Sequence, residues 1–355
     1  MRKVSVIGAG HVGSTVAYAL LLRNVCADLS LVDLDVKKAE GNGLDLEHCQ
    51  QFLPPFKLTS GSSYSLCKNA SVVVITASTQ QPWKTSRYDL LEQNSTIIKE
   101  IMQKIYKYAP NAVVVITTNP VDAITQVAIN CSKYPETKIF GTGTALDTAR
   151  LNQRLARHYN ISTQDVHAHV LGEHGDSSFV AWSGARIGKT AVGSMSKTEQ
   201  DLLQELFIQT QNTGKTIISQ IGHTSFAIGI VTAELVRAVL NDSNEIFPVS
   251  TMVRDYCGIR DVSMSIPCMI GKNGIAKQLP LSLTKVEQTS LARSAETIRA
   301  CGSHAVGLRT TDEVPSVTSG TDPKRALCRL KMRPWMMSDL RATKYNPQKP
   351  MRMLF

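Results

Sequence analysis

The sequence lacks the paired cysteines that metal sites and redox centres require. Eight cysteines are scattered over 355 residues, and no two of them have C-x-x-C spacing. Zinc sites and thioredoxin-like centres depend on closely spaced cysteines, so no metal site is expected. Free thiols without a disulfide framework are typical of a reducing compartment, and we expect the protein in the cytoplasm.

Long apolar runs are also missing. No stretch of 18 apolar residues occurs, so no membrane partner is predicted. The apolar run that begins at Val4 is too short for the hydrophobic region of a secretory signal. Hydrophobic residues still make up 43% of the chain, which is enough for a large core, and the length favours two domains.

The positive charge of the chain is concentrated near its C-terminus. The net charge is +10, but residues 304–355 contain ten Lys and Arg against four Asp and Glu, a net of +6. The first 303 residues therefore carry only +4. We interpret 304–355 as a basic, poorly ordered tail, because prolines are frequent there and long periodic patterns are absent. Nucleic acid is not expected as a partner of the nearly balanced remainder.

Residues 1–142 have the pattern of a doubly wound parallel sheet. Four short runs of Val, Ile and Leu are apolar without alternation, which is typical of strands buried on both faces. Helical patterns at His11 to Arg23 and Leu90 to Tyr108 separate them, which indicates an α/β fold of the Rossmann type. The four predicted strands are Val4 to Ile7, Leu29 to Val32, Val72 to Thr76 and Val113 to Thr117.

Residues 143–303 have a different pattern, and we expect a mixed α+β substrate domain there. One strand is predicted over Val166 to Leu171. The predicted helices are Leu146 to Tyr159, Thr198 to Gln220, Ile228 to Val239 and Val286 to Cys301.

A glycine motif follows the first predicted strand and precedes a helix. In Gly8-Ala9-Gly10-His11-Val12-Gly13, the first glycine permits a tight turn and the second a close approach to a pyrophosphate. The third glycine permits close packing of helix and strand, and the helix N-terminus attracts phosphate. Asp33 ends the second strand, where a carboxylate binds the ribose hydroxyls of NAD and repels the 2′-phosphate of NADP. The sequence therefore predicts NAD as cofactor.

A second motif presents a histidine on an irregular loop. Gly172 to Ser178 has the sequence GEHGDSS, with His174 between glycines. Asp147 and Arg150 are three residues apart on a predicted helix and so share a face. An aspartate paired with a histidine fixes its tautomer and raises its pKa, which favours proton transfer near neutral pH. Arg150 has the geometry to bind a carboxylate through two hydrogen bonds.

These motifs together resemble those of the L-lactate/malate dehydrogenase family, and the bacterial type of L-lactate dehydrogenase most. The resemblance covers residues 1 to about 303. It is carried by five ordered motifs: Gly8 to Gly13, Asn119 to Asp122, Gly141 to Arg150, Gly172 to Ser178, and Gly222 to Ser225.

The resemblance implies a role for each matching residue. It makes His174 the general acid and base, oriented by Asp147, and Arg150 the residue that binds the substrate carboxylate. It implies that Arg87 polarises the reacting carbonyl when a loop closes. Asn119 and Thr224 are implied to contact substrate, and Thr76, Ala77 and Asn119 to contact the cofactor. It also implies a small 2-keto or 2-hydroxy acid as substrate, and a homo-oligomer, either a dimer or a tetramer.

Gln81 is the expected determinant of substrate choice. In the family, malate enzymes carry an arginine at this position and lactate enzymes a glutamine. A neutral side chain cannot offset the second carboxylate of oxaloacetate in a closed site, so Gln81 favours pyruvate. Trp83 and Lys84 depart from the lactate pattern, and Lys84 leaves malate dehydrogenase activity open. The same departures leave open a branched 2-hydroxy-acid dehydrogenase and, more distantly, a non-catalytic NAD-binding protein.

Overall fold

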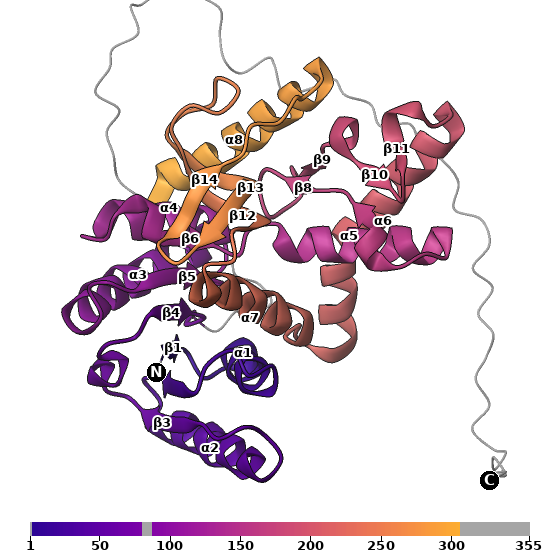
Figure 1. The fold of residues 1–355 in the computed structure, drawn as a ribbon. Coiled ribbons are helices and arrows are strands. Elements are labelled where there is room, and N and C mark those ends of the chain that lie inside the picture. The colour runs from indigo at the N-terminus through magenta and orange to yellow at the C-terminus, as the bar shows by residue number, and fades with distance from the viewer. Residues whose placement is uncertain (1, 80–86, 306–355) are drawn as a thin grey trace, which may run out of the picture. The chain divides into compact units, whose positions relative to one another are not determined.

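A parallel sheet dominates the N-terminal half of the protein. The computed structural model describes residues 2–79 and 87–305 (Figure 1). The parallel strands adjoin in the order β3-β2-β1-β4-β5-β6. The chain therefore adds β2 and β3 on one side of β1, and then β4, β5 and β6 on the other side. This order confirms the predicted Rossmann fold. The strands are β1 (Lys3–Ile7), β2 (Asp28–Val32), β3 (Lys57–Gly61), β4 (Val72–Ile75), β5 (Val113–Ile116) and β6 (Ile139–Gly141).

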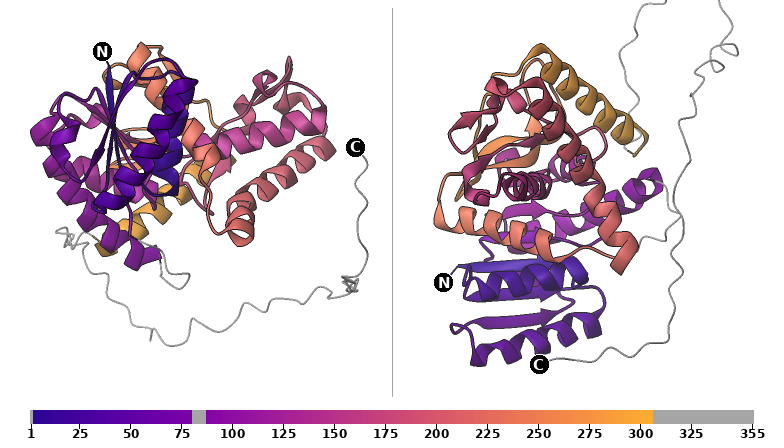
Figure 2. Two further views of the ribbon diagram at one scale, coloured as in Figure 1. Left: turned by 90° about the horizontal axis from the view of Figure 1, so that it is seen from below. Right: turned by 90° about the vertical axis from the view of Figure 1, so that its right-hand side faces the viewer.

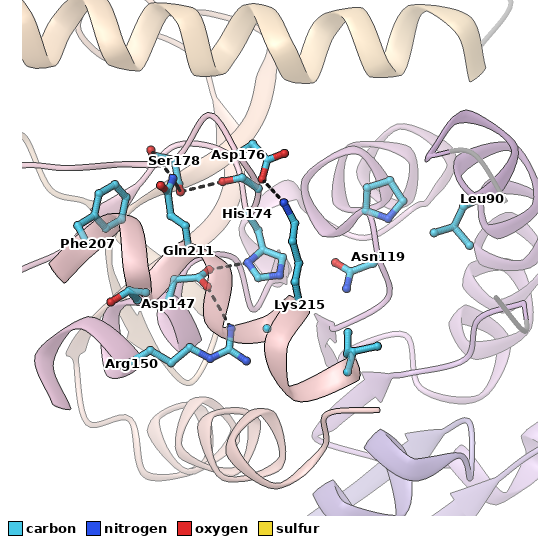
Figure 3. A pocket seen from close by; sticks show the side chains of 15 residues that line it. Leu90, Asn119, Asp147, Arg150, His174, Asp176, Ser178, Phe207, Gln211 and Lys215 are labelled. Atoms are coloured by element: carbon cyan, nitrogen blue, oxygen red, sulfur yellow. Dashed lines mark hydrogen bonds and ion pairs between the residues drawn. The ribbon is translucent and has the colours of Figure 1, made fainter. Parts of the chain in front are cut away.

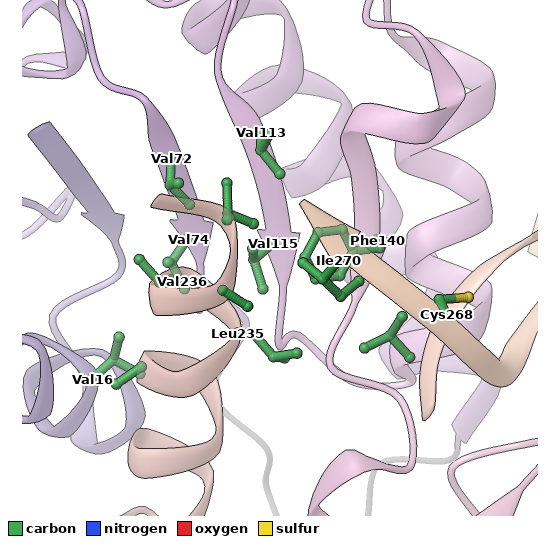
Figure 4. Packing of buried hydrophobic residues seen from close by; sticks show 14 of the residues in the cluster. Val16, Val72, Val74, Val113, Val115, Phe140, Leu235, Val236, Cys268 and Ile270 are labelled. Atoms are coloured by element: carbon green, nitrogen blue, oxygen red, sulfur yellow. The ribbon is translucent and has the colours of Figure 1, made fainter. Parts of the chain in front are cut away.

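The central strands are apolar without interruption because both faces of the sheet are covered. In β5, Val113 and Val115 belong to one hydrophobic cluster, whereas Val114 and Ile116 belong to another on the opposite face. Figure 4 shows Val115 beside Leu235, and Val74 beside Val236, where a helix covers the sheet. The four predicted strands are confirmed as β1, β2, β4 and β5. The sequence analysis missed β3, which is largely polar, and β6, which has three residues.

Helices cover both faces of this sheet (Figure 2). α1 packs against α7 (Phe226–Asn241) of the C-terminal half, and α3 packs against α4. The helices predicted at His11 to Arg23 and Leu90 to Tyr108 are confirmed as α1 and α3, whereas α2 and α4 were not predicted. α2 is largely polar and contains two glycines, which disfavour a helix, and α4 is short and buried over most of its length. The helices are α1 (His11–Leu22), α2 (Val36–Glu47), α3 (Arg87–Tyr108) and α4 (Val121–Cys131).

The C-terminal half extends the same sheet. β12 (Glu245–Val253) pairs with β6, and β13 (Val262–Gly271) and β14 (Gly274–Gln278) continue the sheet with antiparallel pairing. The sequence analysis did not assign these strands, although β12 and β13 are buried over most of their length. The strand predicted over Val166 to Leu171 is divided into β7 (Val166–His167) and β8 (Val170–Leu171).

The remaining elements of the C-terminal half surround a third hydrophobic cluster, to which α5, α6, β7 and β8 contribute. The mixed α+β character predicted for this half is confirmed. A capping box between Ser196 and Glu199 begins α6, and Gly222 ends it in the left-handed conformation. The four predicted helices are confirmed as α5 (Ala145–Tyr159), α6 (Lys197–Ile221), α7 (Phe226–Asn241) and α8 (Lys285–Ala305). The short strands are β9 (Phe179–Val180), β10 (Arg186–Ile187) and β11 (Thr190–Ala191).

Candidate functional site

The glycine loop lies at the carboxyl end of β1, beside the point where the strand order reverses. Gly8 has a φ of +102°, and a Cβ there would lie 2.6 Å from the backbone nitrogen of Ala77. A Cβ on Gly13 would lie 1.8 Å from the carbonyl oxygen of Gly8. The hydroxyl of Thr76 donates to that same oxygen at 2.9 Å. The backbone of Ala77 and the hydroxyl of Thr76 therefore pack closely against the loop, and only glycine fits at positions 8 and 13.

Asp33 and the start of α1 provide the charges that a dinucleotide needs. The Oδ2 atom of Asp33 accepts the backbone N–H of Ala9 at 2.6 Å, and Oδ1 accepts that of Asp35 at 3.0 Å. This carboxylate therefore lies directly beside the glycine loop. The N-cap of α1 is Gly10, which has no side chain that could cap the helix. No acidic residue occupies the first turn of α1. The free N–H groups of this helix end suit a pyrophosphate, so the residues fit NAD.

The second half of the site is a histidine, an aspartate and an arginine. Nδ1 of His174 and Oδ2 of Asp147 are 2.5 Å apart, and Oδ1 of Asp147 lies 3.4 Å from the Arg150 guanidinium (Figure 3). His174 is on the loop after β8, whereas Asp147 and Arg150 lie in the first half of α5. The structure therefore brings together all three residues that the sequence analysis selected, from segments that are separate in the chain.

The Asp147 carboxylate interacts electrostatically with both His174 and Arg150. The Asp147 carboxylate raises the pKa of His174 above its ordinary value, although burial opposes this. Burial would raise the pKa of Asp147, but His174 and Arg150 hold that pKa below its ordinary value. The aspartate therefore stays ionised, holds Nδ1 and leaves Nε2 of the ring for proton exchange.

Two adjoining cavities meet at His174. The larger, of about 470 Å³, is lined by Asp147, Arg150, His174 and the side of α6. The smaller, of about 180 Å³, is lined by Val12 of the glycine loop and by Thr224. Asn119, Arg150 and His174 line both cavities. The space between glycine loop and histidine is thus continuous, as a reaction between a bound dinucleotide and a small substrate requires.

Part of the expected site lies outside the described residues. Gln81, Trp83 and Lys84 belong to the undescribed segment 80–86, so the structure gives no position for them. Arg87 is the first residue of α3, but its side chain is outside the described part as well.

Two residues at the site, Asn94 and His223, were not selected from the sequence. The buried side chain of Asn94 accepts the N–H of Thr79 at 2.9 Å and donates to the carbonyl of Asn119 at 2.7 Å. It thereby joins the segment before residue 80 to the pocket. The ring of His223 stacks on that of His11 with centroids 3.9 Å apart, which connects the glycine loop with the segment before α7. A polar residue at a buried helical position was the available signal for Asn94, whereas no sequence pattern pairs two distant histidines.

No helix among the described residues is long and apolar enough to span a membrane. Those residues also contain no cluster of three or more His, Cys, Asp or Glu side chains with the arrangement of a metal site.

Comparison with known proteins gives consistent results over most of the chain. The NAD-binding domain of lactate/malate dehydrogenases matches residues 2–141, and the α/β C-terminal domain of the same family matches residues 144–305. An L-lactate dehydrogenase of Kosmotoga olearia is 39% identical over 305 residues, which cover 84% of this chain and 94% of that protein. An L-lactate dehydrogenase of Salinibacter ruber is also 39% identical, with coverage of 84% and 96%.

A solved structure has the same fold. It is a lactate dehydrogenase enzyme from a Medee basin deep-sea metagenome library, with a TM-score of 0.81 and 33% identity. The match covers 86% of this chain and 99% of that chain. The fold, the glycine loop with Asp33, and these matches lead to one conclusion: the chain belongs to the lactate/malate dehydrogenase family of NAD-dependent dehydrogenases.

Proposed function

We propose that the protein is an L-lactate dehydrogenase that interconverts pyruvate and L-lactate. The observation that carries this proposal is the group of His174, Asp147 and Arg150 at the meeting point of the two cavities. It supplies a proton-transfer residue and a carboxylate-binding residue next to the glycine loop. The L-lactate dehydrogenases among the similar proteins support the assignment.

In the proposed mechanism, Arg150 binds the carboxylate of pyruvate through two hydrogen bonds, which places the keto carbon next to His174. Protonated His174 then donates its Nε2 proton to the keto oxygen, while Asp147 stabilises the imidazolium. The bound cofactor supplies the hydride. In the reverse direction, neutral His174 accepts the hydroxyl proton of lactate.

Other residues complete the proposed site. We assign Asn119 and Thr224 to substrate contact because both line the smaller cavity. Arg87 is proposed to polarise the keto group, and Gln81 to face the substrate methyl group. These two roles rest on the position of each residue in the sequence.

The proposed cofactor site consists of the glycine loop, Asp33, Thr76, Ala77 and Asn119. Gly8, Gly10 and Gly13, with His11 and Val12, would hold the pyrophosphate at the start of α1, and Asp33 the adenosine ribose. Thr76 and Ala77 support the loop from β4. Residues 1–142 form the proposed cofactor domain, and 143–303 the proposed substrate domain. Of the predicted tail, 304–355, the first two residues still belong to α8 and the rest lie outside the described residues.

Asp33 leads to a prediction about cofactor choice. We expect NADH to be preferred over NADPH by at least about tenfold in kcat/KM, because a 2′-phosphate beside this carboxylate meets a like charge. The measurement is the rate of pyruvate reduction at varied concentrations of each cofactor. In Asp33→Ser the preference should narrow, whereas in Asp35→Ser, a change of a neighbouring carboxylate, it should persist. Equal use of both cofactors by the wild type would remove Asp33 from this role.

We further propose a homo-oligomer in the cytoplasm, a dimer or a tetramer. Large apolar side chains are exposed on α1 and α7, which pack against each other. Tyr18 and Leu22 are 46% and 48% exposed, and Phe226 is 76% exposed. An apolar surface of this kind is typical of an interface between subunits. Free thiols support a reducing compartment, and they are found at Cys26, Cys49, Cys67, Cys131, Cys257 and Cys268.

The function is tested by NADH oxidation with pyruvate, oxaloacetate and a branched 2-keto acid, measured side by side. We expect kcat/KM for pyruvate to be the highest, because Arg150 offers one site for one carboxylate. A preference for oxaloacetate would make the protein a malate dehydrogenase, and a preference for the branched acid would reassign the substrate. Binding of NADH without turnover of any substrate would indicate a non-catalytic protein.

A further inference from the structure

Two histidine rings lie face to face beside the proposed cofactor site. His11 is the first residue of α1, and its ring stacks on that of His223 with centroids 3.9 Å apart and planes inclined by 12°. His11 is exposed and His223 is half-buried, so water reaches the pair. Histidine is the side chain whose charge ordinarily changes between about pH 5 and 8. The proposed proton transfer at His174 uses neither of these rings.

The stacked pair lies where two helices begin. α7 starts at Phe226, three residues after His223, and a Cβ on Gly229 would lie 2.6 Å from the side chain of Thr15 in α1. The first turns of the two helices are therefore in contact. Each helix start carries a partial positive charge, and neither first turn contains an acidic residue. Two helix starts of the same sign thus converge on the pair, which favours an anion beside it.

The pair also borders the place proposed for the pyrophosphate. Val12 follows His11 and Thr224 follows His223 in the chain, and both of these residues line the smaller cavity. Each phosphate of a pyrophosphate carries a negative charge at neutral pH, and a nearby opposite charge favours the protonated form of an imidazole. A bound pyrophosphate and a proton on this pair would therefore stabilise each other.

We propose that His11 and His223 form a proton-linked part of the cofactor site: NADH binds more tightly when the stacked pair is protonated, and its binding draws a proton onto the pair. Stacking holds the two imidazoles together at the glycine loop, so a proton on either ring acts at the same place. This inference rests on the proposed cofactor site, and it concerns the affinity for the cofactor rather than the choice of substrate.

The effect of pH on affinity has a definite sign. If binding takes up a proton, affinity is highest where the histidines are protonated, and it is lost as the pH rises through their titration range. We expect the Kd of NADH to increase about threefold to tenfold between about pH 5.5 and 8, because a single charge close to a solvated anion has an effect of this size. Added salt should reduce the increase, since it screens exposed charges.

Other charged or titratable groups near the pair stay unchanged in the test variants. α1 contains no Asp, Glu, Lys or Arg, and in α7 Glu234 and Arg237 lie at least two turns beyond its start. His174 is also a histidine of the site, so the experiment separates its contribution from that of the pair. The groups across the glycine loop or along the two cavities are Asp33, Asp35, Lys38, Asp147, Arg150, His174, Asp176 and Lys215.

The test is the Kd of NADH, from fluorescence titration over this pH range, in the wild type and in the double variant His11→Phe/His223→Phe. Phenylalanine keeps a flat ring for stacking but takes up no proton. We expect the Kd of the double variant to be nearly independent of pH, and close to the wild-type value at the alkaline end of the range. If the double variant does not fold, His11→Phe replaces it, because this side chain is exposed, and its increase should be smaller than that of the wild type.

His158→Phe is the matched control. His158 is an exposed histidine whose ring contacts that of Tyr159 edge to face, with centroids 4.9 Å apart, and it lines neither cavity. The Kd of NADH in this variant should increase with pH as it does in the wild type.

Two further measurements identify the source of the proton. ADP-ribose contains the pyrophosphate but lacks the nicotinamide, the reacting part of the cofactor that must lie near His174. Its Kd, measured by calorimetry, should therefore increase with pH as that of NADH does. Calorimetry of NADH binding at about pH 7, in buffers of different ionisation enthalpy, gives the proton uptake. We expect uptake of a clear fraction of a proton by the wild type and close to none by the double variant.

Each outcome either supports the proposal or overturns it. A pH-dependent Kd with proton uptake in the wild type, both absent in the double variant, supports the proposal. A wild-type Kd that is independent of pH overturns it, and so does an increase that persists in the Phe variants or that occurs with NADH but not with ADP-ribose. A wild type that binds no NADH at any pH overturns both this inference and the proposed cofactor site. Failure to reduce pyruvate, with NADH still bound, contradicts only the proposed function.

Discussion

Replacement of His174 by alanine is expected to lower kcat/KM for pyruvate by roughly 10²–10⁴. Nδ1 of this residue is held by Asp147 at 2.5 Å, which leaves Nε2 to deliver the proton. Without the imidazole, negative charge develops on the keto oxygen and no positioned acid neutralises it. We expect the Kd of NADH to change little, because the glycine loop and Asp33 remain intact.

The measurement is steady-state pyruvate reduction, with the Kd of NADH from fluorescence titration. His158→Ala is the matched control, since His158 is an exposed histidine near the end of the helix that carries Asp147. Its turnover should equal that of the wild type. Near-normal turnover in His174→Ala would show that another group transfers the proton.

The pH dependence of the reaction follows from the pairing of His174 with Asp147. Because Asp147 raises the pKa of His174, pyruvate reduction should persist above the ordinary titration range of histidine. It should then fall as the pH rises through the raised pKa. Lactate oxidation needs neutral His174 and should increase over that range. In Asp147→Asn the midpoints of both profiles should move to lower pH.

The second large effect is expected at Gln81. Pyruvate should exceed oxaloacetate in kcat/KM by at least about tenfold in the wild type, and Gln81→Arg should narrow or reverse this ratio. Oxaloacetate brings a second carboxylate that Arg150 does not bind. Desolvation of an unpaired carboxylate costs several kcal/mol, and each 1.4 kcal/mol corresponds to about a tenfold change in rate.

Lys84 is the control for this argument, because it belongs to the same segment and carries a positive charge. The ratio of kcat/KM for the two substrates is measured in the wild type, Gln81→Arg and Lys84→Ala. A wild-type preference for oxaloacetate that disappears in Lys84→Ala would identify a malate dehydrogenase with a displaced cation. A preference for oxaloacetate that survives in Lys84→Ala would contradict the assigned position of Gln81.

Local sequence patterns were sufficient to predict the central strands and the glycine loop of the cofactor half. A strand buried on both faces is a continuous apolar run, and a glycine at Gly8 or Gly13 is required by the turn and by close packing. Both signals depend on neighbours along the chain, so the parallel sheet, the loop and Asp33 could be predicted. The short strand β6 and the polar strand β3 could not, because their pairing partners, and not their own composition, stabilise them.

The tertiary structure decided which distant segments come into contact, because residues that are neighbours in the sequence do not specify this. Motif resemblance selected His174 and Asp147, but their 2.5 Å contact depends on how the loop after β8 packs on α5. The burial of Asp122 behind that loop, and the extension of the sheet by β12, join segments more than 50 residues apart. Such contacts depend on how the whole chain packs. The pattern of residues along the sequence does not show which distant segments come together. The residue types that carry the chemistry were therefore determined by the sequence, whereas their distances, charges and pKa values were determined only by the fold.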